Sequence, residues 1–161
     1  MPSKKPKAQP VIDSVGRSYL YSDQIGYLIR RAHQHASAIF QEHNAEPQLT
    51  PVQFALLLVL ATYGSMPQKK VGQYAGVDPS TVTGVVERLR DRGLISVASE
   101  ATDKRKVILS LSKQGEKVCQ RMAEAGHVIT EATLAPLTPV ERVALQMLLK
   151  KLVKLEDDDN S

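Results

Sequence analysis

Hydroxyl and basic side chains gather in a short stretch of the chain that follows Asp78-Pro79. The hydroxyls are those of Ser80, Thr81 and Thr83. Short hydroxyls donate to and accept from base edges and phosphates, and the free N–H groups of a helix N-terminus attract a phosphate. Arg88 follows Gly84 by four residues and Thr81 by seven, which places the three on roughly the same helix face. The pattern is typical of a helix that contacts nucleic acid.

The other face of this stretch is apolar, and a second helix is expected just before it. The apolar positions are Val82, Val85, Val86 and Leu89. A short helix is predicted from about Gln68 to Tyr74, and Gly76 in the following turn suits a left-handed conformation. Two helices joined by such a turn form a helix-turn-helix.

A basic hairpin is predicted directly after these helices. Ile95 and Val97 alternate with Ser96 and Ala98, and the apolar residues at 107, 109 and 111 alternate with Ile108 and Ser110, which is the period of a strand. The tip between the strands carries Lys104, Arg105 and Lys106, with Asp103 as the residue expected to stabilise it. Arginine suits a narrow minor groove, so the tip is expected to reach DNA beside the helix. Taken singly, hydroxyls at a helix start are usually caps and a basic tip is usually a solvated turn.

The remaining elements are helices whose starts are marked by proline. Thr50-Pro51 and Thr138-Pro139 each open a capping box, with Gln53 and Glu141 three residues after the threonine. The expected helices are 22–43, 51–63, 68–74, 79–92, one from after Ser112 to about 132, and 139–155. The predicted fold is therefore mainly α with a small β-hairpin wing, in the order α-α-α-α-β-β-α-α.

Composition narrows the class of protein. The chain has 161 residues and a single cysteine, which excludes an internal disulfide framework and a Cys-rich zinc site. The longest apolar run, Phe54 to Ala61, is too short to span a bilayer, and we expect a soluble, cytoplasmic protein. A net charge of +4 is compatible with nucleic acid but is shared by many proteins that do not bind it.

Three motifs in register resemble the MarR family of bacterial transcription regulators. The first is Leu49-Thr50 with Gln53, Leu57 and Leu60. The second runs from Gly76 through Thr83 to Ile95, and the third is Asp103-Lys104-Arg105 followed by Leu109, Leu111, Ser112 and Gly115. The resemblance covers roughly 22–155. Two departures are Gly84, where many relatives have a long polar residue, and Val71-Gly72, where Leu-Ala is more usual.

The resemblance implies a homodimer that binds a pseudo-palindromic double-stranded DNA operator as a repressor. It implies a helical dimerisation region at 19–48 and 112–155 and a winged helix-turn-helix at 49–111. The composition of the two ends, lysine and proline at one and an acidic run at the other, predicts a basic disordered tail at 1–18 and an acidic tail at 156–161. The candidate DNA contacts are Lys69, Lys70, Ser80, Thr81, Thr83, Gly84, Arg88, Lys104, Arg105 and Lys106.

The resemblance also implies a pocket for a small effector, often an aromatic acid, including nitrogen-heterocyclic ones, that releases the DNA. Cations mixed with aromatic rings suit such a carboxylate. The candidate lining residues are Tyr27, Arg30, Arg31, His33, His35, Phe40 and Tyr63. The alternative is that the arginines and histidines form a solvated helix face.

Other functions find less support in the residues. His33 and His35 are two apart on a helix, so their rings diverge, and we expect no metal and no cofactor. Cys119 is expected to be a buried small hydrophobe and not a redox sensor. No catalytic constellation is visible, so an enzyme is not expected. A winged helix used for protein assembly without DNA remains the alternative, and salt-dependent DNA binding would separate the two.

Overall fold

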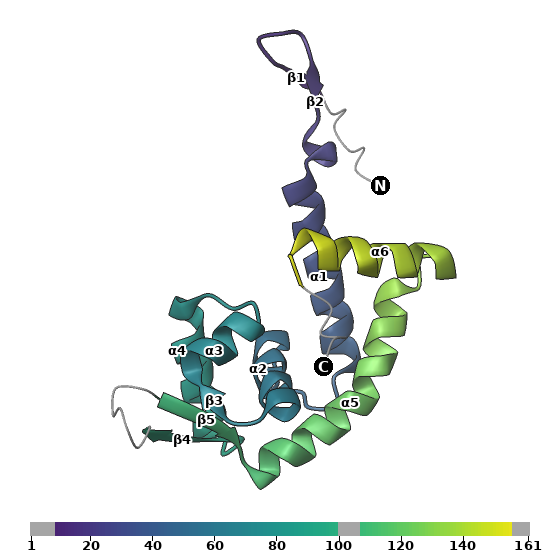
Figure 1. Ribbon diagram of the computed structural model, residues 1–161. Helices are drawn as coiled ribbons and strands as arrows, with labels where there is room; N and C mark the ends of the chain where they lie inside the picture. The colour runs from purple at the N-terminus through teal and green to yellow at the C-terminus, as the bar shows by residue number, and fades with distance from the viewer. Residues whose placement is uncertain (1–8, 100–106, 156–161) are drawn as a thin grey trace, which may run out of the picture. The chain divides into compact units, whose positions relative to one another are not determined.

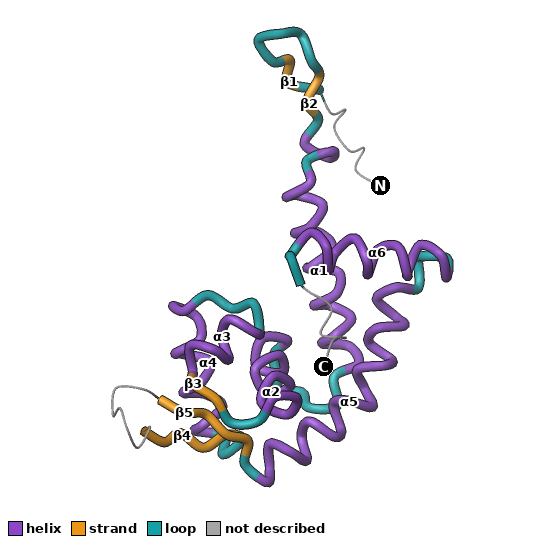
Figure 2. The backbone as a smooth tube through the Cα atoms, in the orientation of Figure 1, coloured by secondary structure: helices purple, strands orange, loops and turns teal. Residues whose placement is uncertain are grey.

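The structure, a computed structural model, describes residues 9–99 and 107–155. The chain divides after Ala38 into two units. Figure 1 labels the elements, and Figure 2 shows where helix and strand alternate with loop. Within the described residues, no helix is both long and apolar enough to cross a membrane.

The first unit holds a small hairpin followed by the start of a helix. Strands β1 (Val11–Ile12) and β2 (Ser18–Tyr19) pair antiparallel, and a 3-10 turn, η1 (Tyr21–Asp23), leads into α1 (Ile25–His43). The sequence analysis did not anticipate this hairpin, because it assigned 1–18 to a disordered tail, and it began the helix three residues too early.

The hairpin turn is held by one carboxylate. Asp13 accepts from the backbone N–H groups of Val15, at 3.0 Å, and Arg17, at 2.8 Å, and it forms an ion pair with the Arg17 side chain at 2.7 Å. The backbone hydrogen bond from Arg17, and then its guanidinium, lower the pKa of Asp13. The hairpin is therefore stabilised by hydrogen bonds of one side chain. Its two-residue strands are too short to show the alternation of apolar and polar residues that usually indicates a hairpin in a sequence.

The second unit begins within α1, at Ile39, and contains the winged helix-turn-helix. Its elements are α2 (Pro51–Tyr63), β3 (Met66–Pro67), α3 (Gln68–Tyr74), α4 (Pro79–Asp91), β4 (Ile95–Ser99), β5 (Val107–Leu111), α5 (Lys113–Leu134) and α6 (Pro139–Leu152). The mainly helical class and the two long strands confirm the sequence prediction. The last helix, however, ends at Leu152, three residues earlier than expected.

The sheet of this unit has one more strand than predicted. Its order is β3-β5-β4, with all pairs antiparallel, and Leu109 of β5 lies between Met66 and Val97. In Figure 1 the sheet lies along one edge of the cluster formed by α2, α3 and α4. The sequence analysis interpreted 64–67 as a break between helices, because two residues are too few to show a strand period.

The core of the second unit is built from leucines and valines contributed by every element around α2. Those with no more than 1% exposure include Leu49, Leu56, Leu57, Val71, Leu89, Leu94, Leu109 and Met122. Phe40 is also buried, and its ring lies 6.1 Å from that of Phe54. Gln53 is buried beside them, and its Oε1 accepts from Thr50 N at 3.0 Å in the predicted capping box.

The end of α4, the start of β4 and the start of α5 converge at one junction. Gly93 adopts a left-handed φ of 67°, as expected for a helix stop, and Ser112 caps α5 by accepting from Gly115 N. Ser112 also donates to the Gly93 carbonyl at 2.6 Å. A β-carbon on Gly115 would lie 2.1 Å from the Leu94 carbonyl oxygen, so only glycine fits there. This junction fixes the direction in which β4 leaves α4.

Candidate nucleic-acid interface

The turn between α3 and α4 is closed by backbone hydrogen bonds. Val77 N donates to Gly72 O at 2.9 Å, and Gly76 adopts the predicted left-handed conformation with φ of 64°. The N–H groups of Thr81 and Val82 both donate to Asp78 O. Asp78 occupies the N-cap position of α4, but its side chain makes no capping hydrogen bond. Proline at the next position supplies the helical φ without one.

Glycine at position 72 allows α3 and α4 to approach closely. A β-carbon there would lie 2.7 Å from Cγ2 of Val82, which is closer than real β-carbons come to other atoms. The departure from the family's usual Leu-Ala therefore has a packing reason in this chain. The close approach fixes how far α4 projects from the domain.

The two faces of α4 divide as the sequence predicts. Val82, Val85, Val86 and Leu89 are buried. The side chains of Ser80, Thr81, Thr83 and Arg88 are exposed, whereas Gly84 is half-buried. The hydroxyl and basic groups therefore share the solvent side of a helix whose opposite side is locked into the core.

The three arginines of α4 and its C-cap have different surroundings. Arg88 extends back along the helix, so that a β-carbon on Gly84 would lie 3.6 Å from its Nη1. Arg90 forms an ion pair with the adjacent Asp91 at 2.9 Å. Arg92 donates to the carbonyl of Gln48 at 2.9 Å, which ties the end of α4 to the loop before α2. Arg88 therefore presents its guanidinium on the hydroxyl-bearing face, while Arg92 has a structural bond.

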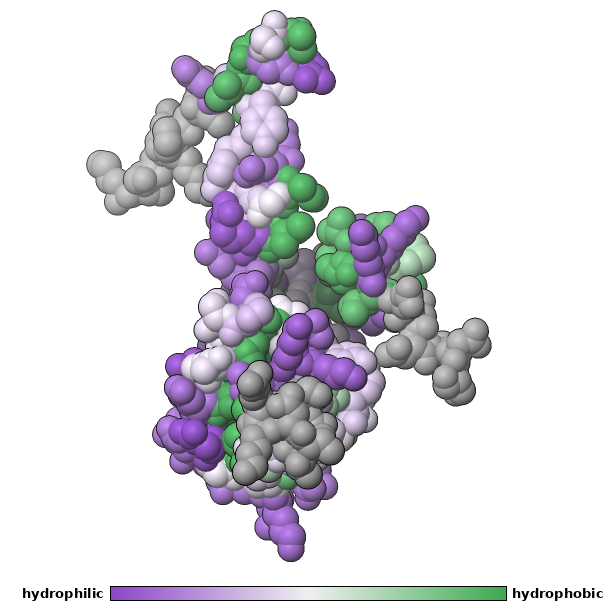
Figure 3. Space-filling model, turned by 60° about the vertical axis from the view of Figure 1, so that its left-hand side comes forward, coloured by the Kyte–Doolittle hydropathy of each residue, from purple (hydrophilic) through white to green (hydrophobic). Residues whose placement is uncertain are grey.

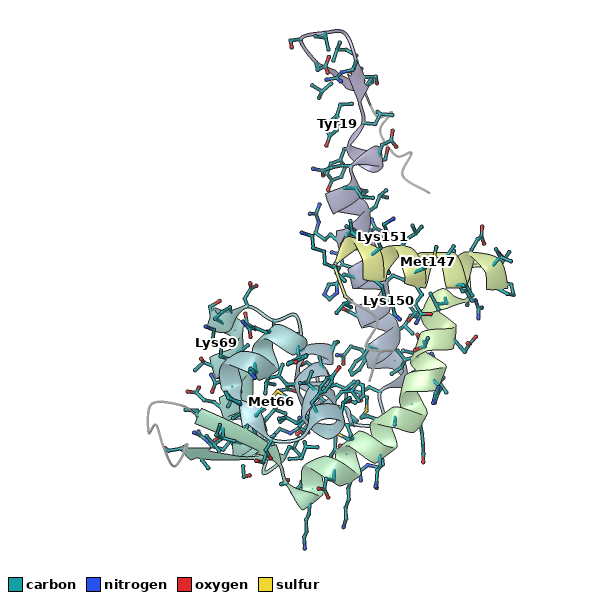
Figure 4. The ribbon with its side chains drawn as sticks, in the orientation of Figure 1. Tyr19, Met66, Lys69, Met147, Lys150 and Lys151 are labelled. Carbon is teal, nitrogen blue, oxygen red and sulfur yellow. The ribbon has the colours of Figure 1, made fainter. Side chains whose placement is uncertain are left out.

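The start of α3 lies beside the start of α4. Lys69 and Lys70 are exposed in the first turn of α3, and Figure 4 shows Lys69 on the outer side of the domain and Met66 within it. An open hollow of about 500 Å³ lies between the two helix starts. Its lining includes Gln68, Lys69, Val82 and Thr83. Gln68 donates from Nε2 to Thr83 Oγ1 at 3.3 Å, a contact that sequence reasoning missed because the two residues are distant in sequence.

The wing is described only at its base. Strands β4 and β5 pair from Ile95 opposite Leu111 to Ser99 opposite Val107, which confirms the predicted hairpin strands. Asp103, Lys104, Arg105 and Lys106 lie outside the described residues.

The candidate effector residues fall into different environments. In the first unit, the rings of Tyr21 and Tyr27 lie 4.2 Å apart, and the Arg30 and Arg31 guanidiniums lie 5.7 and 6.0 Å from the Tyr27 ring centre. Arg30 donates to the Tyr21 hydroxyl at 3.3 Å, and Arg31 donates to that of Tyr27 at 3.4 Å. Tyr21 was missed by the sequence analysis because it precedes the helical pattern.

The remaining candidate effector residues are His33, His35, Phe40 and Tyr63. His33 and His35 are exposed on α1. In the second unit, Phe40 belongs to the core, and the Tyr63 ring stacks at 4.9 Å on that of Tyr74. Cys119 is buried as expected, and burial, followed by the nearby charge of Glu116, raises the pKa of its thiol. A raised pKa lowers the thiolate fraction and so argues against a redox-sensing role.

Comparison with known proteins identifies the family of this chain. The model of the MarR family matches residues 49–107. The transcriptional repressor NicR of Pseudomonas putida is 36% identical over 143 residues, which are 89% of this chain and 89% of NicR. This chain belongs to the MarR family. It is accordingly a transcriptional regulator, and its helix-turn-helix is the family's DNA-binding element.

Solved structures of MarR-type regulators share the whole fold. Bordetella bronchiseptica BpsR, whose DNA binding is regulated by 6-hydroxynicotinic acid, is 37% identical with a TM-score of 0.79, over 86% of this chain and 99% of that one. Streptomyces coelicolor PcaV, solved with its natural ligand, is 28% identical with a TM-score of 0.76, over 84% of this chain and 96% of that one. In the first of these proteins a small molecule regulates DNA binding, and the second is a transcriptional regulator in complex with its natural ligand.

Proposed function

We propose that this chain is a homodimeric repressor that binds a pseudo-palindromic DNA site and releases it when an aromatic acid binds. The observation that carries the DNA half is that the exposed side of α4 carries Thr81, Thr83 and Arg88, opposite a buried apolar face. A helix fixed in this way enters a major groove with its N-terminal residues toward the base edges. The site binds and does no chemistry, so no catalytic residue is required.

The proposed contacts divide into positioning and specifying groups. Lys69 and Lys70, at the exposed start of α3, would pair with backbone phosphates on one side of the groove. Ser80, Thr81, Thr83 and Arg88 would face base edges or nearby phosphates, and Gly84 would let the DNA backbone or Arg88 come close to the helix. Lys104, Arg105 and Lys106 would reach the flanking DNA from the wing, with Asp103 stabilising its tip.

Dimerisation is proposed because α6 has no buried residue in the single chain. Its exposed apolar side chains are Val140, Val143, Leu145, Met147, Leu148, Leu149 and Leu152. Figure 3 shows apolar side chains gathered on α6, and Figure 4 labels Met147 on this helix beside Lys150 and Lys151. A helix of 14 residues is marginal in water without packing, and exposed apolar patches of this kind mark interfaces.

The proposed division of labour follows from these exposures. The regions 19–48 and 112–155 would form the dimer, 49–111 would bind DNA, and 156–161 would be an acidic tail. In the first unit, Ile25, Leu28 and Ile29 of α1 are also exposed, with 68%, 45% and 45% of their surface accessible. A twofold dimer of such chains presents two α4 helices to two half-sites of a pseudo-palindrome.

The proposed effector is an aromatic carboxylate, and the cluster around Tyr27 supports it. Arg30 and Arg31 supply charge-assisted donors for a carboxylate, while Tyr21 and Tyr27 supply ring faces and hydroxyls. His33 and His35 lie on the same helix and remain candidate contacts. Because BpsR responds to 6-hydroxynicotinic acid, a hydroxylated nitrogen-heterocyclic acid is the first compound to test. A repressor of this kind would act in the cytoplasm, on the bacterial chromosome.

The test is a mobility shift on the DNA that flanks the gene for this chain, with and without a panel of aromatic acids. We expect the protein to shift this DNA in a salt-sensitive way, and we expect one acid to release the DNA. The first candidate is 6-hydroxynicotinic acid. A shift that no acid releases would overturn the effector half of the proposal. No shift on flanking DNA or on any duplex recovered from a random library would overturn the DNA half and favour a protein-assembly role.

A further inference from the structure

The hydroxyl of Thr83 is engaged differently from those of Thr62 and Thr130, which also lie inside helices of this chain. Thr62 and Thr130 each donate to the carbonyl four residues earlier, at 2.9 Å to Leu58 and 2.8 Å to Gly126. That back-bond is a common use of a helical threonine hydroxyl. Thr83 instead accepts from Nε2 of Gln68, at 3.3 Å, across the junction between α3 and α4.

The direction of this hydrogen bond decides what Thr83 can offer to a ligand. A threonine hydroxyl has one proton and two lone pairs. When the side-chain amide of Gln68 donates to it, one lone pair is occupied from the side of α3 and the proton is free to point elsewhere. Since Thr83 is exposed, its hydroxyl can donate that proton to a ligand on the solvent side of α4.

Gln68 is well placed to impose this direction. It is the first residue of α3, it is half-buried, and it lines the hollow between the two helix starts together with Thr83. The helices themselves are held at a fixed spacing by the contact of Gly72 with Val82. The amide is therefore held by the fold and does not depend on bound DNA for its position.

We propose that Gln68 is a positioning residue that makes Thr83 a hydrogen-bond donor to DNA. Resting on the proposed function, this inference specifies what one position of α4 reads. Thr83 would select a base with an acceptor on its major-groove edge, such as N7 or O6 of guanine, N7 of adenine or O4 of thymine, and it would disfavour the amino group of cytosine. Gln68 would contribute to specificity without touching the DNA.

The experiment begins with the full-length protein and a random duplex library. The consensus duplex that the wild-type protein selects, and its single base-pair variants, are then titrated with wild type, Gln68→Met, Gln68→Glu, Thr83→Val and the double variant Gln68→Met/Thr83→Val. Gln73→Met is the matched control, because Gln73 is an exposed glutamine on the same helix. Thermal unfolding of every variant separates lost folding from lost specificity.

We expect Thr83→Val to lower the preference at one base pair by about fivefold or more, which is the lower range for a mismatched base pair. Gln68→Met should lower the preference at that same base pair, have little further effect in the Thr83→Val background, and leave other positions unchanged. Gln68→Glu can only accept, so it should turn the Thr83 proton inward and shift the preference toward bases that present an amino donor. Gln73→Met should keep the wild-type profile.

Three results would overturn the inference while leaving the proposed function intact. The first is that Gln68→Met lowers the affinity for all duplexes equally. The second is that Gln68→Met and Thr83→Val change the preference at different base pairs. The third is that Gln68→Glu retains the wild-type preference, which would mean that Thr83 donates to Gln68. A library that yields no consensus would overturn the proposed function itself.

Discussion

The guanidinium of Arg88 lies over Gly84, with Nη1 3.6 Å and Nη2 3.9 Å from the place where a β-carbon of residue 84 would be. These distances correspond to ordinary van der Waals contact. A long side chain at position 84 would compete with Arg88 for this surface. Arg88 therefore takes the place that the missing side chain leaves on the exposed face of α4.

This relationship predicts different outcomes for two substitutions. Arg88→Ala should weaken binding to the selected duplex by about 1–3 kcal/mol if the guanidinium contacts a base. Gly84→Ala should leave the affinity close to that of the wild type, because a methyl group at 3.6 Å fits beside the guanidinium. Fluorescence anisotropy titrations measure both. A loss in Gly84→Ala as large as that in Arg88→Ala would show that DNA also approaches Gly84 closely, and would contradict the expectation that a methyl group is tolerated there.

The wing contributes a prediction that rests on the sequence and the paired strands. Arg105→Ala should weaken binding by about 1–3 kcal/mol if Arg105 enters a groove. Lys117→Ala removes the same charge from the exposed surface of α5 and should have a much smaller effect. If both variants lose the same affinity, the wing acts only through net charge.

The junction between α4 and α5 predicts an asymmetry between two glycines of one helix. Gly115→Ala would place a β-carbon 2.1 Å from Leu94 O, so the backbone must move, and the free energy of unfolding should fall by about 2–3 kcal/mol. Gly126→Ala meets nothing within 4 Å and should raise the stability by about 0.5–1 kcal/mol. Urea unfolding monitored by circular dichroism tests the pair. A stable Gly115→Ala variant would contradict the packing of Ser112, Gly93 and Leu94 described above.

The capping box of α6 predicts a pH dependence. The backbone N–H of Thr138, and then its hydroxyl, donate to Glu141 and hold the pKa of that carboxyl below its ordinary value near 4.5. Because the folded pKa is the lower one, the stabilisation is present above the unfolded pKa and is lost as the pH falls through the folded value. A carbon NMR titration should find Glu141 at a lower pKa in the native protein than in urea, with Thr138→Ala moving it partly back. Identical values in the native and unfolded chains would rule out the capping box in solution.

The exposed face of α6 predicts the oligomeric state. Leu148→Glu places a charge among apolar side chains that are 36–79% exposed in the single chain, and it should shift the protein toward monomer in sedimentation velocity. Gln146 lies four residues from both Arg142 and Lys150, on a polar side of α6. The Gln146→Glu variant should therefore remain dimeric. A wild-type protein that sediments as a monomer, or a Leu148→Glu variant that stays dimeric, would remove α6 from the interface.

Much of the fold could be predicted because local rules and tertiary packing agree. Several features can be recognised from residues that are close in sequence. They are the capping boxes at Thr50 and Thr138, the left-handed glycines at 76 and 93, and the strand alternation in 107–111. The two-residue strand β3 could not be predicted, because its pairing depends on β5, which lies about 40 residues away. The hairpin of β1 and β2 depends on Asp13 side-chain bonds, which leave no period in the sequence.

The candidate site was only partly predictable, for a similar reason. The exposure of the α4 hydroxyls and of Arg88 could be predicted, because helical spacing places them opposite the buried apolar side chains. The roles of Gln68 and Tyr21 could not be found in this way, since each acts through a contact with a residue outside its own helical period, Thr83 and Arg30 respectively. Gly72 was recognised as a departure from the family pattern, but its packing against Val82 became visible only in three dimensions.

The most direct test of the account is the affinity of the wild-type protein for the library-selected duplex and for a scrambled duplex, each at 50 and 200 mM salt. The account predicts that the selected duplex binds at least about a thousandfold more tightly, and that its affinity falls by about a thousandfold or more between the two salt concentrations as phosphate contacts are screened. Equal affinity for the two duplexes, or binding that does not change with salt, would contradict sequence-specific DNA recognition by α4.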